Sequence, residues 1–244
     1  MAHELARHKY NLLLVARSGP ALESLAEMLA QQYGVRVDYL AVDLSLPTAA
    51  AQVKQWCVAK GYPVSVLINN AGYALWGRFE QLDLEAQRNL MQLNMQTLVD
   101  LSYELLPLLK QHRPAYILNI ASTAAYQAVP TLSVYAATKS FVLLFTRGLR
   151  YELRHSPVSV SCLSPGATAT NFIERAGMQA MQSTAAKFEM TSEEVARLGI
   201  RGMLKGRAEI VPGFLNLVSV KATYLLPKWL TEKIAANLYE KHLQ

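Results

Sequence analysis

Three side chains with complementary acid–base chemistry lie close together in the sequence: Ser122, Tyr135 and Lys139, in the spacing S-x12-Y-x3-K. Tyr135 and Lys139 belong to a helical run, Tyr-Ala-Ala-Thr-Lys, in which residues i and i+4 share one face. A phenol in water has a pKa of ~10, and a neighbouring lysine cation is expected to lower that pKa and favour proton exchange near neutrality. The Ser122 hydroxyl can hold a substrate oxygen and share the charge that develops on it. The set predicts proton transfer to a carbonyl oxygen or from an alcohol; the alternative is a helix with one buried tyrosine and one surface lysine.

The elements that must position these groups alternate along the chain. Mostly apolar strands are predicted at residues 11–16, 35–42, 64–68, 115–121, 158–163 and 209–211. Helices are predicted at about 20–33, 47–60, 84–111, 135–154, 171–190 and, behind a Thr191 cap, 191–206. Strands that alternate with helices indicate βαβ units and a parallel sheet covered on both faces. Ser122 follows the 115–121 strand, and ligands of open α/β sheets bind at such carboxyl strand ends.

Further motifs surround the trio in a fixed order. Asn69-Asn70-Ala71-Gly72 follows the 64–68 strand, Asn94 lies 28 residues before Ser122, and Pro165-Gly166 follows the 158–163 strand with Thr170 four residues later. Over nearly the whole chain this set resembles the short-chain dehydrogenase/reductase superfamily. The resemblance implies an α/β fold with a Rossmann-like doubly wound parallel sheet in three layers, α/β/α.

The resemblance also implies a role for each residue of the catalytic set. Tyr135 would be the proton donor or acceptor, and Lys139 would bind the nicotinamide ribose and lower the Tyr135 pKa. Ser122 would orient the substrate oxygen, and Asn94 would support a water-mediated proton relay.

The choice of cofactor is predicted from the ends of the first two strands. The 11–16 strand leads into Arg17-Ser18 without an acid, and a guanidinium near this point accommodates the 2′-phosphate of NADP. NADP(H) is therefore the expected cofactor; the alternative is a surface arginine that leads into a helix. By resemblance, the residues expected to contact the cofactor are Arg17, Ser18, Asp43, Leu44, Asn70, Ala71, Gly72, Tyr135, Lys139, Pro165, Gly166, Thr168 and Thr170.

The segment after Gly166 departs from the regular pattern. In the family, an insertion at this place, here about residues 167–206, covers the substrate like a lid. Its apolar residues would line an apolar pocket or simply pack between helices: Phe172, Ile173, Met178, Met181 and Phe188. The apolar, basic tail at 214–244 would pack on a neighbouring subunit or the core, or touch a membrane surface.

The family's opening strand and its T-G-x-x-x-G-I-G turn do not occur in this sequence. Residues 1–8 are similar to the end of the helix that follows those glycines. The first, central strand of the sheet is therefore predicted to be missing, which leaves a slot of unpaired backbone groups between the 11–16 and 64–68 strands. Three explanations are open: a start codon placed too late, a truncated product that is completed by another chain, or a rearranged protein that acts only by binding.

Composition agrees with one domain over residues 1–244, since 52% hydrophobic residues suit a sheet buried on both faces. No apolar run nears the ~20 residues of a membrane span, and no signal segment opens the chain. Two cysteines without metal-ligand spacing favour a reducing, cytoplasmic setting, and five scattered histidines predict no metal site. The net charge is +6, but the basic residues are distributed along the chain and alternate with acidic ones, so nucleic acid is not an expected partner.

The predicted function is an NADP(H)-dependent oxidoreductase that moves hydride between nicotinamide and a carbonyl/alcohol pair. Reduction of a ketone or ketoacyl group is the expected direction, because cells keep NADP pools reduced. The substrate is expected to be small and apolar, and its identity stays open among ketoacyl, steroid-like and aromatic carbonyls. The rival hypothesis is a catalytically impaired protein that acts by binding or dimerisation. By resemblance, a homodimer or homotetramer forms through the helices of Asn94 and Tyr135.

Overall fold

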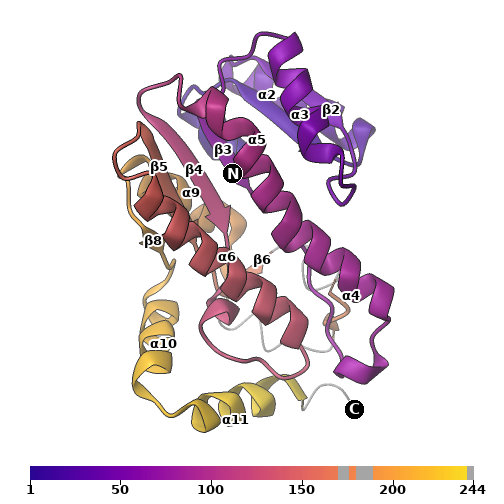
Figure 1. The fold of residues 1–244 in the computed structure, drawn as a ribbon, viewed down its shortest axis with the longest axis vertical. Helices are drawn as coiled ribbons and strands as arrows, with labels where there is room; N and C mark the ends of the chain where they lie inside the picture. Colours follow the sequence, from indigo (N-terminus) through magenta and orange to yellow (C-terminus); the bar gives the residue numbers. More distant parts are fainter. Residues whose placement is uncertain (170–175, 180–188, 241–244) are drawn as a thin grey trace.

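A parallel sheet between two layers of helices forms the frame of the protein. The computed structural model describes residues 1–169, 176–179 and 189–240 (Figure 1). The strands of the frame are β1 (Leu12–Ala16), β2 (Val37–Ala41), β3 (Val66–Asn69), β4 (Ala115–Ile120), β5 (Val158–Leu163) and β8 (Glu209–Ile210). All of their pairings are parallel. The Rossmann-like α/β prediction is confirmed.

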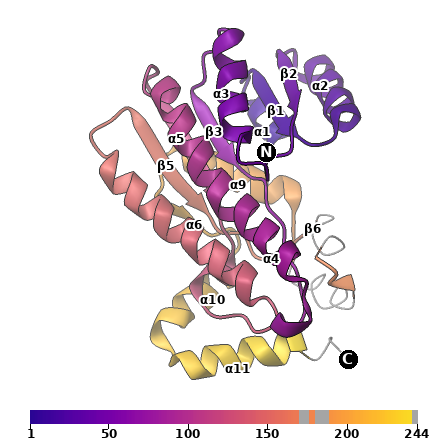
Figure 2. The ribbon, with the colours of Figure 1, turned by 45° about the vertical axis from the view of Figure 1, so that its right-hand side comes forward.

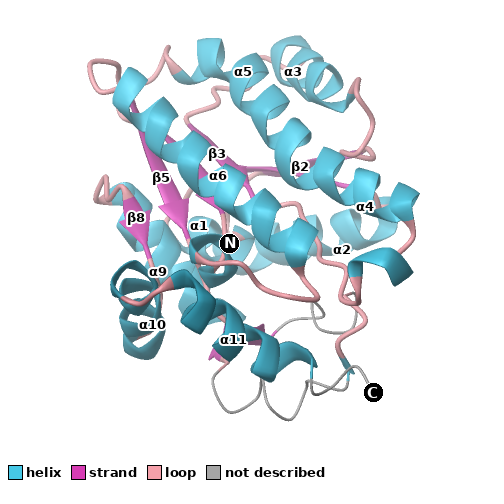
Figure 3. Ribbon diagram, turned by 60° about the horizontal axis from the view of Figure 1, so that its bottom comes forward, coloured by secondary structure: helices cyan, strands magenta, loops and turns pink. Residues whose placement is uncertain are grey.

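Helices cover both faces of the sheet. One layer holds α3 (Ala49–Ala59), α5 (Thr97–Leu109) and α6 (Ser133–Glu152), and the opposite layer holds α1 (Ala2–Arg7), α2 (Gly19–Tyr33) and α9 (Ser192–Leu204) (Figure 2). The other elements are η1 (Phe79–Gln81), α4 (Leu84–Met91), η2 (Gln92–Gln96), η3 (Thr123–Tyr126), β6 (Thr168–Ala169), β7 (Met190–Thr191), α10 (Phe214–Leu225) and α11 (Lys228–Tyr239). The last two helices lie beyond the sheet, at one end of the molecule (Figure 3).

The sheet is divided into two hydrogen-bonded parts within the described residues. One part has the order β1-β2 and the other the order β3-β4-β5-β8. Leu12 donates its backbone N–H to the Arg36 carbonyl, and the backbone groups of alternate residues in a strand point to opposite edges. The backbone groups of Leu13 and Val15 therefore face away from β2. The division falls where the sequence predicts the central strand to be missing.

Side chains continue the two apolar layers across this division. Leu13 of β1 and Leu67 of β3 belong to the cluster under α3 and α5. Leu14 and Ile68 belong to the cluster under α1, α2 and α9. Apolar burial contributes roughly 25 cal/mol per Å², so packing against shared helices can hold two sheet parts that no backbone hydrogen bond joins.

Local predictions from the sequence have mixed outcomes. The cap of α9 is confirmed, because the Thr191 hydroxyl accepts a 3.2 Å hydrogen bond from the Glu194 N–H. The helix predicted through Met190 is wrong at that residue, which pairs as β7 with β6. Part of the predicted lid lies outside the described residues, including Thr170, Phe172, Ile173, Met181 and Phe188.

No helix in the described part of the chain has the length and apolar character to cross a membrane.

Hydrogen exchange followed by NMR tests the divided sheet. We expect the amides that face the division, Leu13 and Val15, to exchange faster than Leu12 and Leu14 of the same strand, which face β2. Exchange depends on the opening of hydrogen bonds, so neighbours in one strand provide their own control. Equal protection of both sets would show that the two parts are joined in solution.

Candidate active site

Tyr135 lies in the first turn of α6 with its phenol buried and hydrogen-bonded to Ser122. Burial raises the pKa of Tyr135 to about 12, while the Ser122 hydrogen bond acts in the opposite direction. The sequence predicts a pKa lowered by Lys139; the pKa is instead raised, because desolvation of the phenolate is its largest cause and Lys139 is not among its causes. A phenol with a raised pKa keeps its proton at neutral pH.

Lys139 lies one helical turn after Tyr135 and is also buried. Its Nζ donates a 2.9 Å hydrogen bond to the carbonyl of Ile120, the last residue of β4, and lies 5.8 Å from the centre of the Tyr135 ring. Burial lowers the pKa of Lys139 to about 8. A lysine cation carries three donors, and the described residues supply an acceptor for one of them.

Asn94 lies in the π-helical turn η2 between α4 and α5 and is almost fully buried. Its Oδ1 accepts from the Tyr73 N–H at 3.1 Å, and its Nδ2 donates to the Tyr73 carbonyl at 3.0 Å and to Thr138 Oγ1 at 3.1 Å. Such π-turns inside α-helices occur frequently at functional sites. Asn94 thus fixes the loop after β3 to the Tyr135 helix.

A chain of buried, hydrogen-bonded polar groups anchors the Asn69–Gly72 turn to the interior of the fold. The Asn69 amide donates to Ser102 Oγ at 3.1 Å and to Asn119 Oδ1 at 2.8 Å, and the Asn119 amide donates to Thr146 Oγ1 at 3.0 Å. Asn70, Ala71 and Gly72 lie at the carboxyl end of β3, where Asn70 and Ala71 are exposed. A Cβ at Gly72 would lie 2.9 Å from Asn94 Oδ1 and 3.4 Å from Lys139 Nζ, so only glycine fits between these two side chains.

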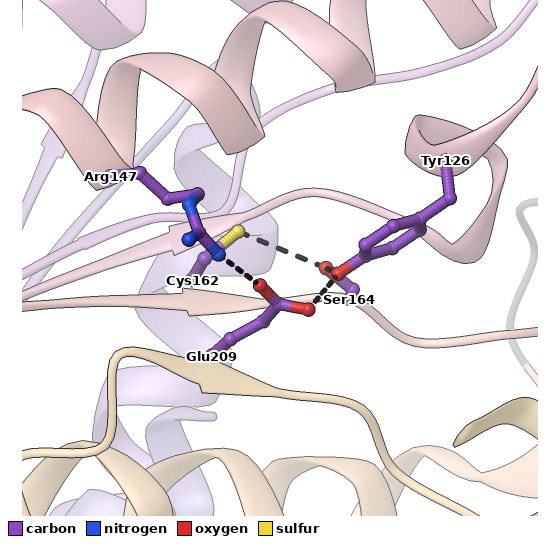
Figure 4. A network of polar contacts seen from close by, with 5 residues as sticks. All are labelled: Tyr126, Arg147, Cys162, Ser164 and Glu209. Atoms are coloured by element: carbon purple, nitrogen blue, oxygen red, sulfur yellow. Dashed lines mark hydrogen bonds and ion pairs between the residues drawn. The ribbon is translucent and has the colours of Figure 1, made fainter. Parts of the chain in front are cut away.

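Behind Ser122 lies a polar network that the sequence patterns do not indicate (Figure 4). The Tyr126 hydroxyl donates to Glu209 Oε1 at 2.7 Å and contacts Ser164 Oγ at 3.0 Å, and Arg147 pairs with Glu209 at 3.1 Å. The Ser164 hydroxyl lies 3.8 Å from the sulfur of Cys162. These contacts fasten η3, the turn that Ser122 caps, to β8 and α6. The residues are far apart in sequence, so only the folded chain brings them together.

The residues predicted to bind the adenosine end of a cofactor lie where β1 and β2 end. Arg17 is exposed and close enough to Asp43 to help lower the pKa of its carboxyl, although hydrogen bonds from Ser45 are the larger cause. Ser18 caps α2 by accepting from the Ala21 N–H at 3.4 Å. Leu44 is buried in the core, and its carbonyl accepts from the Thr97 hydroxyl at 2.6 Å, so its backbone N–H is the group left for a ligand.

The segment after β5 lies beside Ser122. The Pro165 carbonyl accepts a 2.9 Å hydrogen bond from the Thr123 N–H, and Thr168 Oγ1 donates to the Gly166 carbonyl at 3.0 Å. A Cβ on Gly166 would lie 2.5 Å from the Asn216 side chain. This close approach of α10 explains the glycine. The structure therefore brings the predicted residues from five strand ends to one edge, with Thr170 outside the described residues.

Apolar side chains surround the Tyr135 phenol. Its cluster includes Met178 of the predicted lid and Ala235 of α11, and Trp76 and Tyr239 pack against it. Met178 is thus buried in an apolar cluster, which agrees with either predicted role, a pocket lining or packing between helices, whereas the other predicted apolar lid residues lie outside the described part of the chain. The same cover excludes water and causes the high Tyr135 pKa.

Replacement of Gly72 tests the packing of the site. We expect Gly72→Ala to lower the free energy of unfolding by about 1–3 kcal/mol, because the new methyl group displaces Asn94 from its three hydrogen bonds. Gly148→Ala is the control, since a Cβ at this position of α6 would meet no other atom within 4 Å, and it should stabilise the helix by roughly 0.5–1 kcal/mol. Equal effects of the two changes in thermal or urea unfolding would contradict the tight fit at Gly72.

Comparison with known proteins agrees with this geometry. The family model for short chain dehydrogenases matches residues 1–182. Hydroxysteroid dehydrogenase-like protein 1 of Gallus gallus is 26% identical over 94% of this chain and 68% of its own length. Very-long-chain 3-oxoacyl-CoA reductase of Mycosarcoma maydis is 29% identical over 94% of this chain and 67% of its own length.

A solved structure extends the likeness to three dimensions. A short-chain dehydrogenase from Sphingobium yanoikuyae, in complex with NADPH, superposes with a TM-score of 0.80 at 30% identity, over 92% of this chain and 88% of that one. With the family model matching about three-quarters of the residues and the predicted site gathered at one sheet edge, this chain belongs to the short-chain dehydrogenase family of oxidoreductases.

Proposed function

We propose that the protein reduces a ketone on an apolar substrate with NADPH. The observation that carries the proposal is the buried Tyr135 phenol, which is hydrogen-bonded to the half-buried Ser122 and has the buried Lys139 beside it. Nothing in the packing of α6 requires a hydroxyl, a phenol and an ammonium at one point. Buried polar groups are costly unless they are used or paired.

The residues present suit both ends of a nicotinamide dinucleotide. Lys139 keeps two donors without an acceptor among the described residues, which fits the two hydroxyls of a ribose. At the other end, the exposed Arg17 follows β1 and suits a 2′-phosphate. The NADPH complex of the similar Sphingobium enzyme supports the same choice. A bound NADPH would supply the hydride.

The remaining chemistry is proton transfer by this chain's own residues. The Ser122 and Tyr135 hydroxyls already share a hydrogen bond, so a carbonyl oxygen placed at that point can accept from both. Tyr135 then gives up its proton, and the Lys139 ammonium stabilises the phenolate that is left. Because the pKa of Tyr135 is raised to about 12, the protonated form needed for reduction predominates at neutral pH.

The proposed substrate is a carbonyl on a bulky apolar body. Met178, Trp76 and Ala235 give the surroundings of Tyr135 an apolar character, and ligand sites of this kind take their affinity from apolar contact. Two relatives are named for hydroxysteroids and for very-long-chain 3-oxoacyl-CoA. A steroid-like ketone and a long-chain 3-oxoacyl thioester are the two substrate classes proposed.

We also propose subunit pairing through α5 and α6. Their outer faces expose large side chains, Tyr103 on α5 and Leu144 and Tyr151 on α6. Exposed apolar patches on a helix pair are typical of an interface.

Tyr135→Phe removes the proposed proton donor and keeps the ring. We expect kcat for ketone reduction to fall by about 10²–10⁴-fold, the usual contribution of a general acid, with NADPH affinity little changed. NADPH absorbance measures the first quantity, and fluorescence titration measures the second. Tyr151→Phe, an exposed tyrosine of the same helix, is the matched control. Turnover by Tyr135→Phe near the wild-type rate would refute the role of the phenol, and a folded wild type that binds no NADPH would favour the rival binding protein.

Arg17→Gln tests the choice of cofactor. Hydrogen bonds to charged groups contribute about 1.5–3 kcal/mol, so the preference for NADPH over NADH in kcat/KM should fall by roughly 10–100-fold. Arg36→Gln makes the same change in charge at the opposite end of the β1–β2 pair and should leave the preference unaltered. An unchanged preference in Arg17→Gln would show that another group selects the cofactor.

A further inference from the structure

α10 carries large apolar side chains on the side that is turned away from the protein. Its inward stripe, Asn216, Val220 and Thr223, follows the i, i+4, i+7 spacing of one helix face and is turned toward the protein. The opposite stripe has the same kind of spacing and contains Phe214, Val218, Lys221 and Leu225. Phe214 and Leu225 are 78% and 84% exposed. The apolar stripe of a helix normally faces a core or a partner, whereas this stripe is turned away from the protein.

The apolar surface continues into α11. Tyr224, Leu226 and Trp229 at the junction of the two helices are exposed as well. Figures 1 and 3 show both helices at the end of the molecule, beyond the sheet, where their outer sides are free of other labelled elements. We name this surface, made by Phe214, Val218, Lys221, Tyr224, Leu225 and Trp229, the C-terminal face.

Two kinds of partner could cover the C-terminal face, a second copy of this chain or a lipid bilayer, and the charges on the face distinguish them. Lys221 lies within the apolar stripe, Lys228 begins α11, and residues 210–231 contain no acid. In a symmetric contact with a second copy, the two apolar stripes would face each other. The Lys221 of each copy would then lie between them without an acid as partner. An anionic bilayer surface pairs those lysines with headgroups while the apolar side chains enter the acyl boundary.

The residue types fit a bilayer surface as well. Tyr and Trp are enriched at membrane interfaces, where one end of the ring is apolar and the other is hydrated. Tyr224 and Trp229 occupy this position beside Phe214 and Leu225. We propose that the C-terminal face docks the protein on an anionic lipid bilayer, in the plane of the interface and without crossing it.

Docking there has a consequence for the active site that rests on the proposed function. The inner side of α11 carries Ala235 and Tyr239 into the cluster around Tyr135. The same helix pair therefore contacts the bilayer on one side and the surroundings of the proton donor on the other. An apolar ketone dissolved in the membrane would reach the site without passing through water.

Vesicle binding tests the docking without cofactor or substrate, so its outcome is independent of the proposed reaction. We expect the chain to sediment with phosphatidylcholine vesicles that contain phosphatidylserine, and the Trp229 emission to shift to the blue. Phe214→Ser and Leu225→Ser should each weaken partitioning by about 10–100-fold, the equivalent of one apolar side chain. Lys221→Gln should weaken it by roughly fivefold, the usual effect of one lysine at an anionic surface.

Val58→Ser is the matched control, since it removes an exposed apolar side chain from α3 and should leave partitioning unchanged. Equal binding to neutral and anionic vesicles, or an equal loss in Val58→Ser, would overturn the proposal. So would a wild type that ignores vesicles and forms a dimer that Phe214→Ser and Leu225→Ser dissociate in sedimentation equilibrium. That last result would assign the C-terminal face to a second copy.

Discussion

The hydrogen bond between Asn69 and Asn119 is the interaction on which the arrangement of the site depends. These two buried residues are partners in the register of β3 and β4, and a slip of one residue would turn each side chain to the opposite face. Ser102 of α5 and Thr146 of α6 extend the contact to the helices of one layer. Asn69 leads directly into the Gly72 turn, and Asn119 comes directly before Ile120, whose carbonyl holds Lys139. This chain of hydrogen bonds thus fixes the positions of the Gly72 turn, Ser122 and Lys139 relative to one another at the end of the sheet.

The two ends of a bound dinucleotide would lie on different parts of the divided sheet. The proposed nicotinamide end lies on β3, β4 and β5, which are joined by hydrogen bonds, whereas Arg17 and Asp43, at the proposed adenosine end, follow β1 and β2. Side-chain packing under shared helices fixes the distance between these parts. Apolar contact is non-directional, so it maintains proximity with less geometric restriction than a strand ladder. A dinucleotide that bridges both parts would itself supply part of the connection between them.

Local pattern and motif order are enough to predict much of the fold and the reacting groups. Strand 158–163 and the helix of Tyr135 follow from apolar periodicity, and the gathering of Ser122, Tyr135 and Lys139 follows from parallel strands that end at one edge. The helix prediction fails at Met190 because its pairing partner, Thr168, lies far along the chain. The Tyr126–Glu209 contact joins residues 83 positions apart and carries no local signal. The direction in which the pKa of Tyr135 is shifted could not be predicted, because it depends on how completely other segments of the chain bury the phenol.

That cover comes from parts of the chain remote from the catalytic motif. Ala176 and Met178 follow the site segment, and Ala235 and Tyr239 belong to α11, which lies beyond the residues matched by the family model. Tyr239 also raises the Tyr135 pKa, by a smaller amount than burial itself. Burial keeps the phenol protonated, and the protonated phenol is the form that the proposed carbonyl reduction uses, so the packing of the C-terminal helix contributes to the protonation state on which the proposal depends. The motif provides the proposed reacting groups, and the C-terminal helix is one of the segments whose packing raises the pKa of Tyr135.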